Sequence, residues 1–292
     1  MFQRLLVCTD FTDGLNRLTH FVPSLAKAGI QHITFFHSVP LWESGEIPRV
    51  DTEKIEAARQ QLTVALSDRP ADIDVQVEVS SGRPLDLILQ TAVRHQSDLI
   101  LVGISSRNLL TDTLFGNTTV ELHGRTTIPL MILRPQLISA FTAEELDLRC
   151  QHLFRNWLLP YDGTEPSKFM VNRIKQLAQN RPPGVLEKCS VCWVVEDVSR
   201  EAVLQDAERQ TAEKALVAVK AELEACGIQT EIAVRQGNPV VEVLEAASMD
   251  DVSAIALSSR LPNKLVDWST PHFAVELLRR SWHPLIYFPG QR

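Results

Sequence analysis

Short apolar runs alternate with longer amphipathic stretches along the first half of the chain. In these stretches apolar residues recur at spacings of three and four, as Leu15, Leu18, Val22 and Leu25 do, and this periodicity indicates helices. Strands joined by helices need crossover connections, so the pattern predicts an α/β fold with a parallel sheet that carries helices on both faces. Five runs are typical of its strands: residues 4–10, 32–37, 73–79, 99–102 and 129–133.

The second half of the chain repeats the first. The Gly-Arg-Pro motif at residues 82–84 corresponds to Gly-Asn-Pro at residues 237–239, an offset of 155. Near the start, residues 6–10 correspond to 158–162 at an offset of 152, so a net three residues are inserted in between. Self-similarity over so long a period predicts one α/β unit used twice, with a five-stranded parallel sheet in each.

The unit boundaries follow from the repeat. We expect a first domain at residues 1–138, a second at 153–292 and a linker at 139–152, where no strong strand pattern is present. The second half also has a longer helical pattern over residues 199–225. Its apolar stripe is expected to face the core: Leu204, Ala207, Ala212, Leu216, Val219 and Leu223.

Composition narrows the class of protein. Of the 292 residues, 45% are hydrophobic and 22% charged, the balance of an ordinary globular protein. The net charge is −7 and no Lys/Arg cluster stands out, which argues against a nucleic-acid partner. No apolar run approaches the length of a membrane span, and five scattered cysteines favour reduced thiols over a disulfide framework. Together with a start that lacks signal-peptide organisation, this predicts a cytoplasmic protein without membrane contact.

Two loops could hold a ligand. Parallel sheets bind ligands beyond the carboxyl ends of their strands, where the strand order reverses. The loop after the first strand carries Thr9 and Asp10, and the loop after the fourth strand runs from Gly103 to Gly116, Asn117 and Thr118. Gly103 permits a close backbone approach, and the later residues look like a helix start, whose free N–H groups favour phosphate oxygens.

These residues resemble the universal stress protein family. Its nucleotide-binding members carry Gly, two residues, Gly, nine residues, Gly and Ser/Thr after the fourth strand. Here Gly103 and Gly116 stand at the matching separation, Ser106 takes the place of the middle glycine, and Asn117 followed by Thr118 takes that of Ser/Thr. The segments 7–12 and 82–84 resemble the family as well, and the resemblance covers both halves of the chain.

The resemblance implies a fold, a ligand and a role. It implies two tandem flavodoxin-like units, of the adenine nucleotide alpha hydrolase-like kind, paired into an internal pseudo-dimer through their last strands. The ligand would be an adenine nucleotide, ATP, ADP or AMP, with Mg²⁺ able to accompany ATP, and the role would lie in stress response or regulation.

By this resemblance the first unit holds the ligand. Asp10, with Thr9 beside it, would accept hydrogen bonds from the adenine or ribose edge, and the backbone at Ser38 would face the base. The residues around the ribose and phosphates would be Gly103, Ser106, Gly116, Asn117 and Thr118. Ser106 adds a Cβ where the family has none, which weakens close backbone approach without abolishing it.

The second half departs from this pattern. At the offset of 155 the five loop residues become Ser258, Leu261, Pro271, His272 and Phe273. Apolar bulk and a proline without an N–H replace the polar groups, so the phosphate loop is predicted to be lost. Asp162 is then a turn or cap residue. Trp268 and Trp282 are expected either to fill the vacated pocket or to form a partner surface.

No catalytic machinery is evident in the sequence. Cys189 and Cys192 lie in a strand, where residues three apart point to opposite faces, so they do not indicate a metal or redox site. We expect His37, His95 and His123 to be structural. Neither a nucleophile elbow nor a P-loop is present, so any ATP hydrolysis would be slow. The main alternative is a nucleotide-independent structural or interaction protein. A protein partner, and a choice between an internally paired monomer and a homodimer, stay open.

Overall fold

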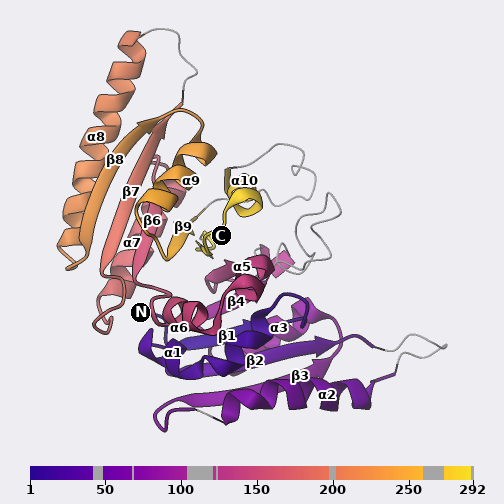
Figure 1. Ribbon diagram of the computed structural model, residues 1–292. Helices are drawn as coiled ribbons and strands as arrows, with labels where there is room; N and C mark the ends of the chain where they lie inside the picture. Colours follow the sequence, from indigo (N-terminus) through magenta and orange to yellow (C-terminus); the bar gives the residue numbers. More distant parts are fainter. Residues whose placement is uncertain are drawn as a thin grey trace. The chain divides into compact units, whose positions relative to one another are not determined.

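The computed structural model describes residues 1–41, 49–67, 69–103, 121–122, 124–196, 202–258 and 273–290. They form two compact units, Phe2–Gln151 and His152–Arg292 (Figure 1). The described elements of the first unit are β1 (Arg4–Cys8), η1 (Leu15–His20), α1 (Val22–Lys27), β2 (His32–Val39), α2 (Thr52–Thr63), η2 (Val64–Leu66), β3 (Asp74–Ser81), α3 (Pro84–Arg94), β4 (Leu99–Gly103), β5 (Leu130–Leu133), α5 (Pro135–Ala140) and α6 (Ala143–Gln151).

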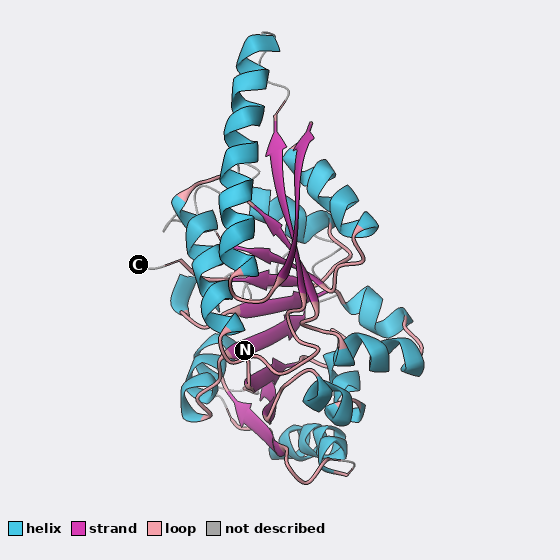
Figure 2. Cartoon of the chain, turned by 90° about the vertical axis from the view of Figure 1, so that its left-hand side faces the viewer, coloured by secondary structure: helices cyan, strands magenta, loops and turns pink. Residues whose placement is uncertain are grey.

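The sheet of the first unit has the predicted parallel topology. Its strands lie in the order β3-β2-β1-β4-β5, and every described pair is parallel. Strands β1 and β4 are buried almost throughout, because helices cover both faces of the sheet (Figure 2). The order reverses between β1 and β4, which places the carboxyl ends of these two strands at the switch point.

The first crossover differs from the single helix that its periodicity predicts. Leu15 and Leu18 lie in the 3-10 helix η1, while Val22 and Leu25 lie in α1, and all four side chains are buried. Pro23 lacks the N–H that would continue one helix through this segment, so a new helix begins around it. The pattern therefore identified the buried face correctly but missed the break in the helix.

The segment between the halves contains a capped helix. Thr142 and Glu145 exchange backbone-to-side-chain hydrogen bonds of 2.9 and 3.3 Å at the start of α6, forming a capping box. Helix α6 contacts α1, and Ser24 donates a hydrogen bond to Asp147. The Arg17 guanidinium donates to the carbonyl groups of Ile138 and Phe141. Residues 138–151 thus pack on the first unit.

The second unit repeats the same plan. Its described elements are β6 (Asn156–Pro160), α7 (Glu165–Ala178), β7 (Lys188–Val195), α8 (Ala202–Glu224), β8 (Gln229–Gln236), α9 (Pro239–Met249), β9 (Ala254–Leu257), α10 (Phe273–Arg280) and β10 (Leu285–Tyr287). The strand order is β10-β9-β6-β7-β8, and all described pairs are parallel. Its core includes Trp157, packed against Phe154 and Phe288.

The structure locates the length change within the repeat. β1 and β6 are offset by 152 residues and β2 and β7 by 156, so four residues are added in the first crossover of the second unit. From β3 and β8 onward the offset is 155, and α3 and α9 match at both ends. The expected pairing of the two units through their last strands stays a prediction.

The stripe on α8 is only partly buried. Ala212, Leu216, Val219 and Leu223 are buried as predicted, whereas Ala207 is exposed, which corrects its assignment to the core. Residues 206–211 are exposed on every side of the helix. An alanine is small enough to sit on an exposed helical surface at little cost, so its place in the periodicity was not informative.

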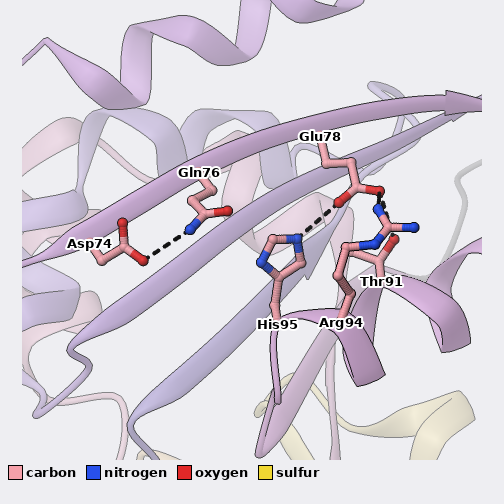
Figure 3. Close-up of polar contacts among 6 residues, drawn as sticks. All are labelled: Asp74, Gln76, Glu78, Thr91, Arg94 and His95. Carbon is pink, nitrogen blue, oxygen red and sulfur yellow. Dashed lines mark hydrogen bonds and ion pairs between the residues drawn. The ribbon is translucent and has the colours of Figure 1, made fainter.

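A polar network joins the edge strand β3 to the end of α3 (Figure 3). Glu78 accepts a hydrogen bond from His95 Nε2 at 2.9 Å, and it also pairs with Arg94 and with Thr91 Oγ1 at 3.3 Å. Burial by itself raises the pKa of Glu78, but the hydrogen bonds from His95 and Arg94 outweigh burial and hold the pKa below its ordinary value. His95 is thus held against β3 by Glu78, and its structural role stays a prediction.

We expect Glu78→Gln to lower the free energy of unfolding by about 1 kcal/mol at pH 7. A carboxyl group whose pKa is lowered by folding stabilises the folded state at pH values above its unfolded-state pKa of 4.5. That stabilisation is lost as the pH falls through the lower pKa of the folded state. The deficit of the variant, measured by urea unfolding, should therefore shrink at pH 3. Glu56→Gln, which removes an exposed pair with Arg59, is the matched control. An equal deficit at both pH values would contradict this account.

Candidate functional site

The candidate site lies where β1, β2 and β4 end. Cys8 pairs with Phe36 of β2 and with Val102 of β4, so the residues that follow these strands emerge at one edge of the sheet. Thr9 and Asp10 follow β1, Ser38 lies near the end of β2, and Gly103 ends β4. Ser106, Gly116, Asn117 and Thr118 lie outside the described residues.

The turn after β1 is held by two short-range contacts. Asp10 Oδ1 accepts hydrogen bonds of 2.8 Å from both the N–H and the hydroxyl of Thr12, forming an Asx turn. Phe11 lies between them with a φ of 63°, in the left-handed region that a bulky side chain rarely adopts. Its N–H donates to Thr9 Oγ1 at 3.0 Å. The second carboxylate oxygen of the exposed Asp10 lies outside this turn.

Asp13 is the buried carboxyl group of this edge, and the sequence reasoning missed it. The residue is 3% exposed and accepts hydrogen bonds from Thr9 Oγ1 at 2.7 Å, Leu15 N at 2.9 Å and Asp10 N at 3.2 Å. Burial and then the nearby Asp10 charge raise the pKa of Asp13 to about 6, although these hydrogen bonds oppose the rise. Through these three hydrogen bonds the buried carboxyl group holds the turn after β1 in place.

Gly103 is required by Asp13. A Cβ placed on Gly103 would lie 2.5 Å from the Asp13 Cβ and 2.9 Å from its carboxyl group. The sequence pattern predicts that this glycine allows a close backbone approach to a ligand, whereas in the structure the close approach is to a side chain of the chain itself. The glycine alone is therefore no evidence of a ligand.

The backbone ladder between β1 and β2 stops at Ser38. Thr9 N donates to Phe36 O at 3.0 Å, and in a continued parallel ladder Ser38 N would donate next to Thr9 O. Instead Thr9 O lies 2.7 Å from His37 Nδ1, which must be the donor because a carbonyl only accepts. Phe11 N is already bonded to Thr9 Oγ1. Within the described residues, the backbone N–H and C=O of Ser38 on this side are left without a partner.

The second unit keeps the turn but changes what surrounds it. Asp162 Oδ1 accepts from Thr164 N at 3.0 Å and from its hydroxyl at 2.6 Å, so Asp162 is the turn residue that the sequence predicted. Gly163 occupies the left-handed position with a φ of 73°. Glu165, at the position of Asp13, turns outward to Lys168, and Ser258 replaces Gly103. The buried carboxyl group and the glycine are thus lost together.

Trp193 is an aromatic residue at this edge of the second unit. It occupies the register position of His37, with its ring 3.0 Å from where a Cβ on Gly163 would lie and 5.8 Å from the Tyr161 ring centroid. Trp282 is 59% exposed and precedes β10, which places it at the amino edge of the sheet. The expectation that Trp282 fills the vacated pocket is therefore wrong, while Trp268 lies outside the described residues.

The two cysteines that the sequence singles out lie in the described part of the chain. Cys189 and Cys192 are buried in β7 and free, and the described residues contain no group of three or more potential metal ligands. His123 lies outside the described residues. None of the helices in the described part has the length and apolar content that crossing a bilayer demands.

Comparison with known proteins agrees with this repeated plan. The model of the universal stress protein family matches residues 1–134 and 153–289, which together make up most of the chain. The chain belongs to the universal stress protein family. A universal stress protein of Archaeoglobus fulgidus has a similar structure, with a TM-score of 0.66 at 18% identity over 97% of this chain and 95% of that one.

Two further relatives have less specific names. A Pseudomonas aeruginosa protein of unknown function reaches a TM-score of 0.60 at 12% identity and covers 98% of this chain and 92% of its own. The stress response protein NhaX of Bacillus subtilis is 25% identical over 87 residues, 30% of this chain. That match spans 51% of NhaX, about half of its length. The structural likenesses establish the flavodoxin-like fold of universal stress proteins in tandem.

We expect Gly103→Ala to destabilise the first unit by about 2 kcal/mol, because the added methyl group overlaps Asp13. Native-state hydrogen exchange of the β1 and β4 amides measures the loss. Gly124→Ala is the control, since a Cβ there meets nothing within 4 Å. Asp13→Gly removes the Asp13 Cβ, so adding Gly103→Ala to that variant should change its stability very little. A full additional loss in the double variant would show that Asp13 is not the obstacle.

The raised pKa of Asp13 predicts a pH dependence. Its ordinary value is 3.8 and its folded value about 6, so in this window the folded chain binds more protons than the unfolded chain. Stability therefore rises as the pH falls from 7 to 5, by about 1 kcal/mol. Asp13→Asn removes this titration, so the difference in unfolding free energy between wild type and variant should change by that amount. A difference that is constant with pH would contradict a raised pKa.

Proposed function

We propose that the first unit binds an adenine nucleotide at the carboxyl edge of β1, β2 and β4, and that the protein acts in stress response or regulation. Thr9, Asp10 and Ser38 would hold the base and ribose. The loop from Gly103 through Ser106, Gly116, Asn117 and Thr118 would surround the ribose and phosphates.

The observation that carries this proposal is the interrupted ladder at Ser38. A donor and an acceptor lie side by side on one strand, in the plane of the sheet, where β1 has turned away. Adenine presents an amino donor next to a ring-nitrogen acceptor on its edge, which complements such a pair. The second oxygen of Asp10 is a further acceptor at the same edge. The residues therefore fit a purine base.

The phosphate end of the ligand would lie at the loop after β4. We expect backbone N–H groups of the loop after β4 to bind the phosphates, since the chain has a net charge of −7 and no basic cluster. The ligand would be ATP, ADP or AMP. Mg²⁺ would arrive with the phosphates of ATP, and the described residues contain no group of three or more potential metal ligands.

The regulatory role would follow from ligand binding. A ligand that binds one conformation better shifts the population toward it and can alter a partner surface. We propose that the units pair through their last strands, so that a change at the first site reaches the second unit, and that the protein works in the cytoplasm with a protein partner or as a homodimer. The buried free cysteines are compatible with a reducing compartment.

A second candidate is a nucleotide-independent interaction protein. The packing of Asp13 against Gly103 favours it, because that glycine has a structural reason to be present without any ligand. Ser106 in place of the family's glycine points the same way. The two candidates differ in one measurable property, which is the binding of nucleotide to the purified chain.

Calorimetric titration of the nucleotide-stripped protein with ATP, ADP and AMP should give one site per chain. We expect Asp10→Asn to weaken the affinity at least fivefold, because the amide oxygen can still accept from Thr12 while the charge and one acceptor are lost. Asp162→Asn makes the same change in the matching turn and should leave affinity unchanged. No binding at millimolar nucleotide would favour the interaction protein, and two sites would mean that the second unit also binds.

A further inference from the structure

Phe11 is the strained residue of the candidate site. Its φ of 63° lies in the left-handed region, which is unfavourable for a residue with a Cβ, and strain of this kind gathers at functional positions. The second unit adopts the same turn with Gly163, which has no such penalty. The turn therefore does not need a phenylalanine, and its side chain calls for a separate explanation.

The left-handed conformation brings the Phe11 ring onto His37. The two ring centroids lie 4.4 Å apart with planes inclined by 47°. His37 is itself fixed, because Nδ1 donates to Thr9 O at 2.7 Å. Both side chains are only partly buried, so aromatic surface remains accessible at the edge of the sheet. The aromatic pair thus lies next to Ser38, whose backbone groups on this side have no partner among the described residues.

The position of this pair fits the geometry of a planar ligand. Hydrogen bonds to Ser38 would lie in the plane of the base, which then extends the sheet beyond β1. Successive side chains of a strand point to opposite faces, so His37 and Ser38 flank that plane from different sides. A base held by its edge at Ser38 would present one π-face to the side on which His37 and Phe11 stand.

We propose that Phe11 and His37 form an aromatic platform on which the base of a bound adenine nucleotide stacks. The proposal rests on the proposed nucleotide site and adds the element that selects a planar base over a bare sugar phosphate. Stacking of a base on an aromatic side chain contributes substantially to affinity in other proteins. In the second unit Trp193 takes the place of His37 and covers Gly163, so the platform has a different shape there.

The test compares variants of the full chain by titration with AMP. Phe11→Leu keeps an apolar side chain and removes the π-face, and we expect about a 5- to 10-fold weaker affinity, with the same ratio for ATP because only the base is affected. Phe11→Tyr should bind within about twofold of wild type. Ribose 5-phosphate should bind at least about tenfold more weakly than AMP. The adenine absorbance near 260 nm should fall on binding to wild type and not to Phe11→Leu.

Controls separate stacking from stability and from the proposed function. Phe141→Leu truncates another partly exposed aromatic residue, on the segment before α6, and should leave affinity unchanged. His37→Asn keeps a donor toward Thr9 O but removes the ring, so it should weaken binding as Phe11→Leu does. If wild type binds AMP while Phe11→Leu binds equally well, the platform is wrong and the nucleotide site stands. If Phe11→Tyr loses as much as Phe11→Leu, the role is turn packing and the platform is again wrong. If wild type binds no AMP, the nucleotide site itself is wrong.

Discussion

Parallel pairing of β1 with β2 on one side and β4 on the other is the constraint on which the first unit depends. The chain must leave β1 and travel across a face of the sheet to reach β2, while β4 continues toward the opposite edge. The two connections diverge, so the strand ends between them lose their neighbours in the plane of the sheet. Thr9, Asp13 and Gly103 fill part of this gap with protein. Ser38 is the backbone position for which the chain provides no partner on that side within the described residues.

The two units show which parts of this arrangement the fold itself requires. Both units leave their first strand through an Asx turn with a left-handed residue. In both, the N–H of the residue just before the Asx residue makes the last backbone hydrogen bond to the neighbouring strand, from Thr9 to Phe36 and from Tyr161 to Cys192. These features are common to both and belong to the scaffold. The buried carboxyl group, the glycine at the end of β4 and the Phe11–His37 contact occur in the first unit. A function confined to that unit would have to depend on them.

Most of the fold could be predicted from the sequence, because strand runs and helical periodicity reflect burial that each element experiences locally. The carboxyl edge of the sheet followed from topology alone. Asp13 could not be found in this way, since an aspartate between a polar turn and a helix start looks exposed until β4 closes over it. The end of one helix and the start of the next near Pro23 could have been predicted from the missing N–H of proline. The regular spacing of four apolar residues favoured a single helix instead. The choice between the two roles of Trp282 could not be made from the sequence, because proximity in sequence to the altered loop does not specify which edge of the sheet a residue reaches.

The fit of Asp13 to Gly103 has a consequence for how the two halves can evolve. The residues are 90 positions apart, yet a Cβ at one excludes the other as it stands. Gene conversion that copied only the turn after β1 into the second unit would place an aspartate against the side chain of Ser258. Conversion in the other direction, of the end of β9 onto that of β4, would place a Cβ against Asp13. Only a tract long enough to carry both positions would leave a well-packed unit. Short exchanges between the repeats would therefore be selected against, which allows the halves of a duplicated gene to diverge while their backbones stay alike.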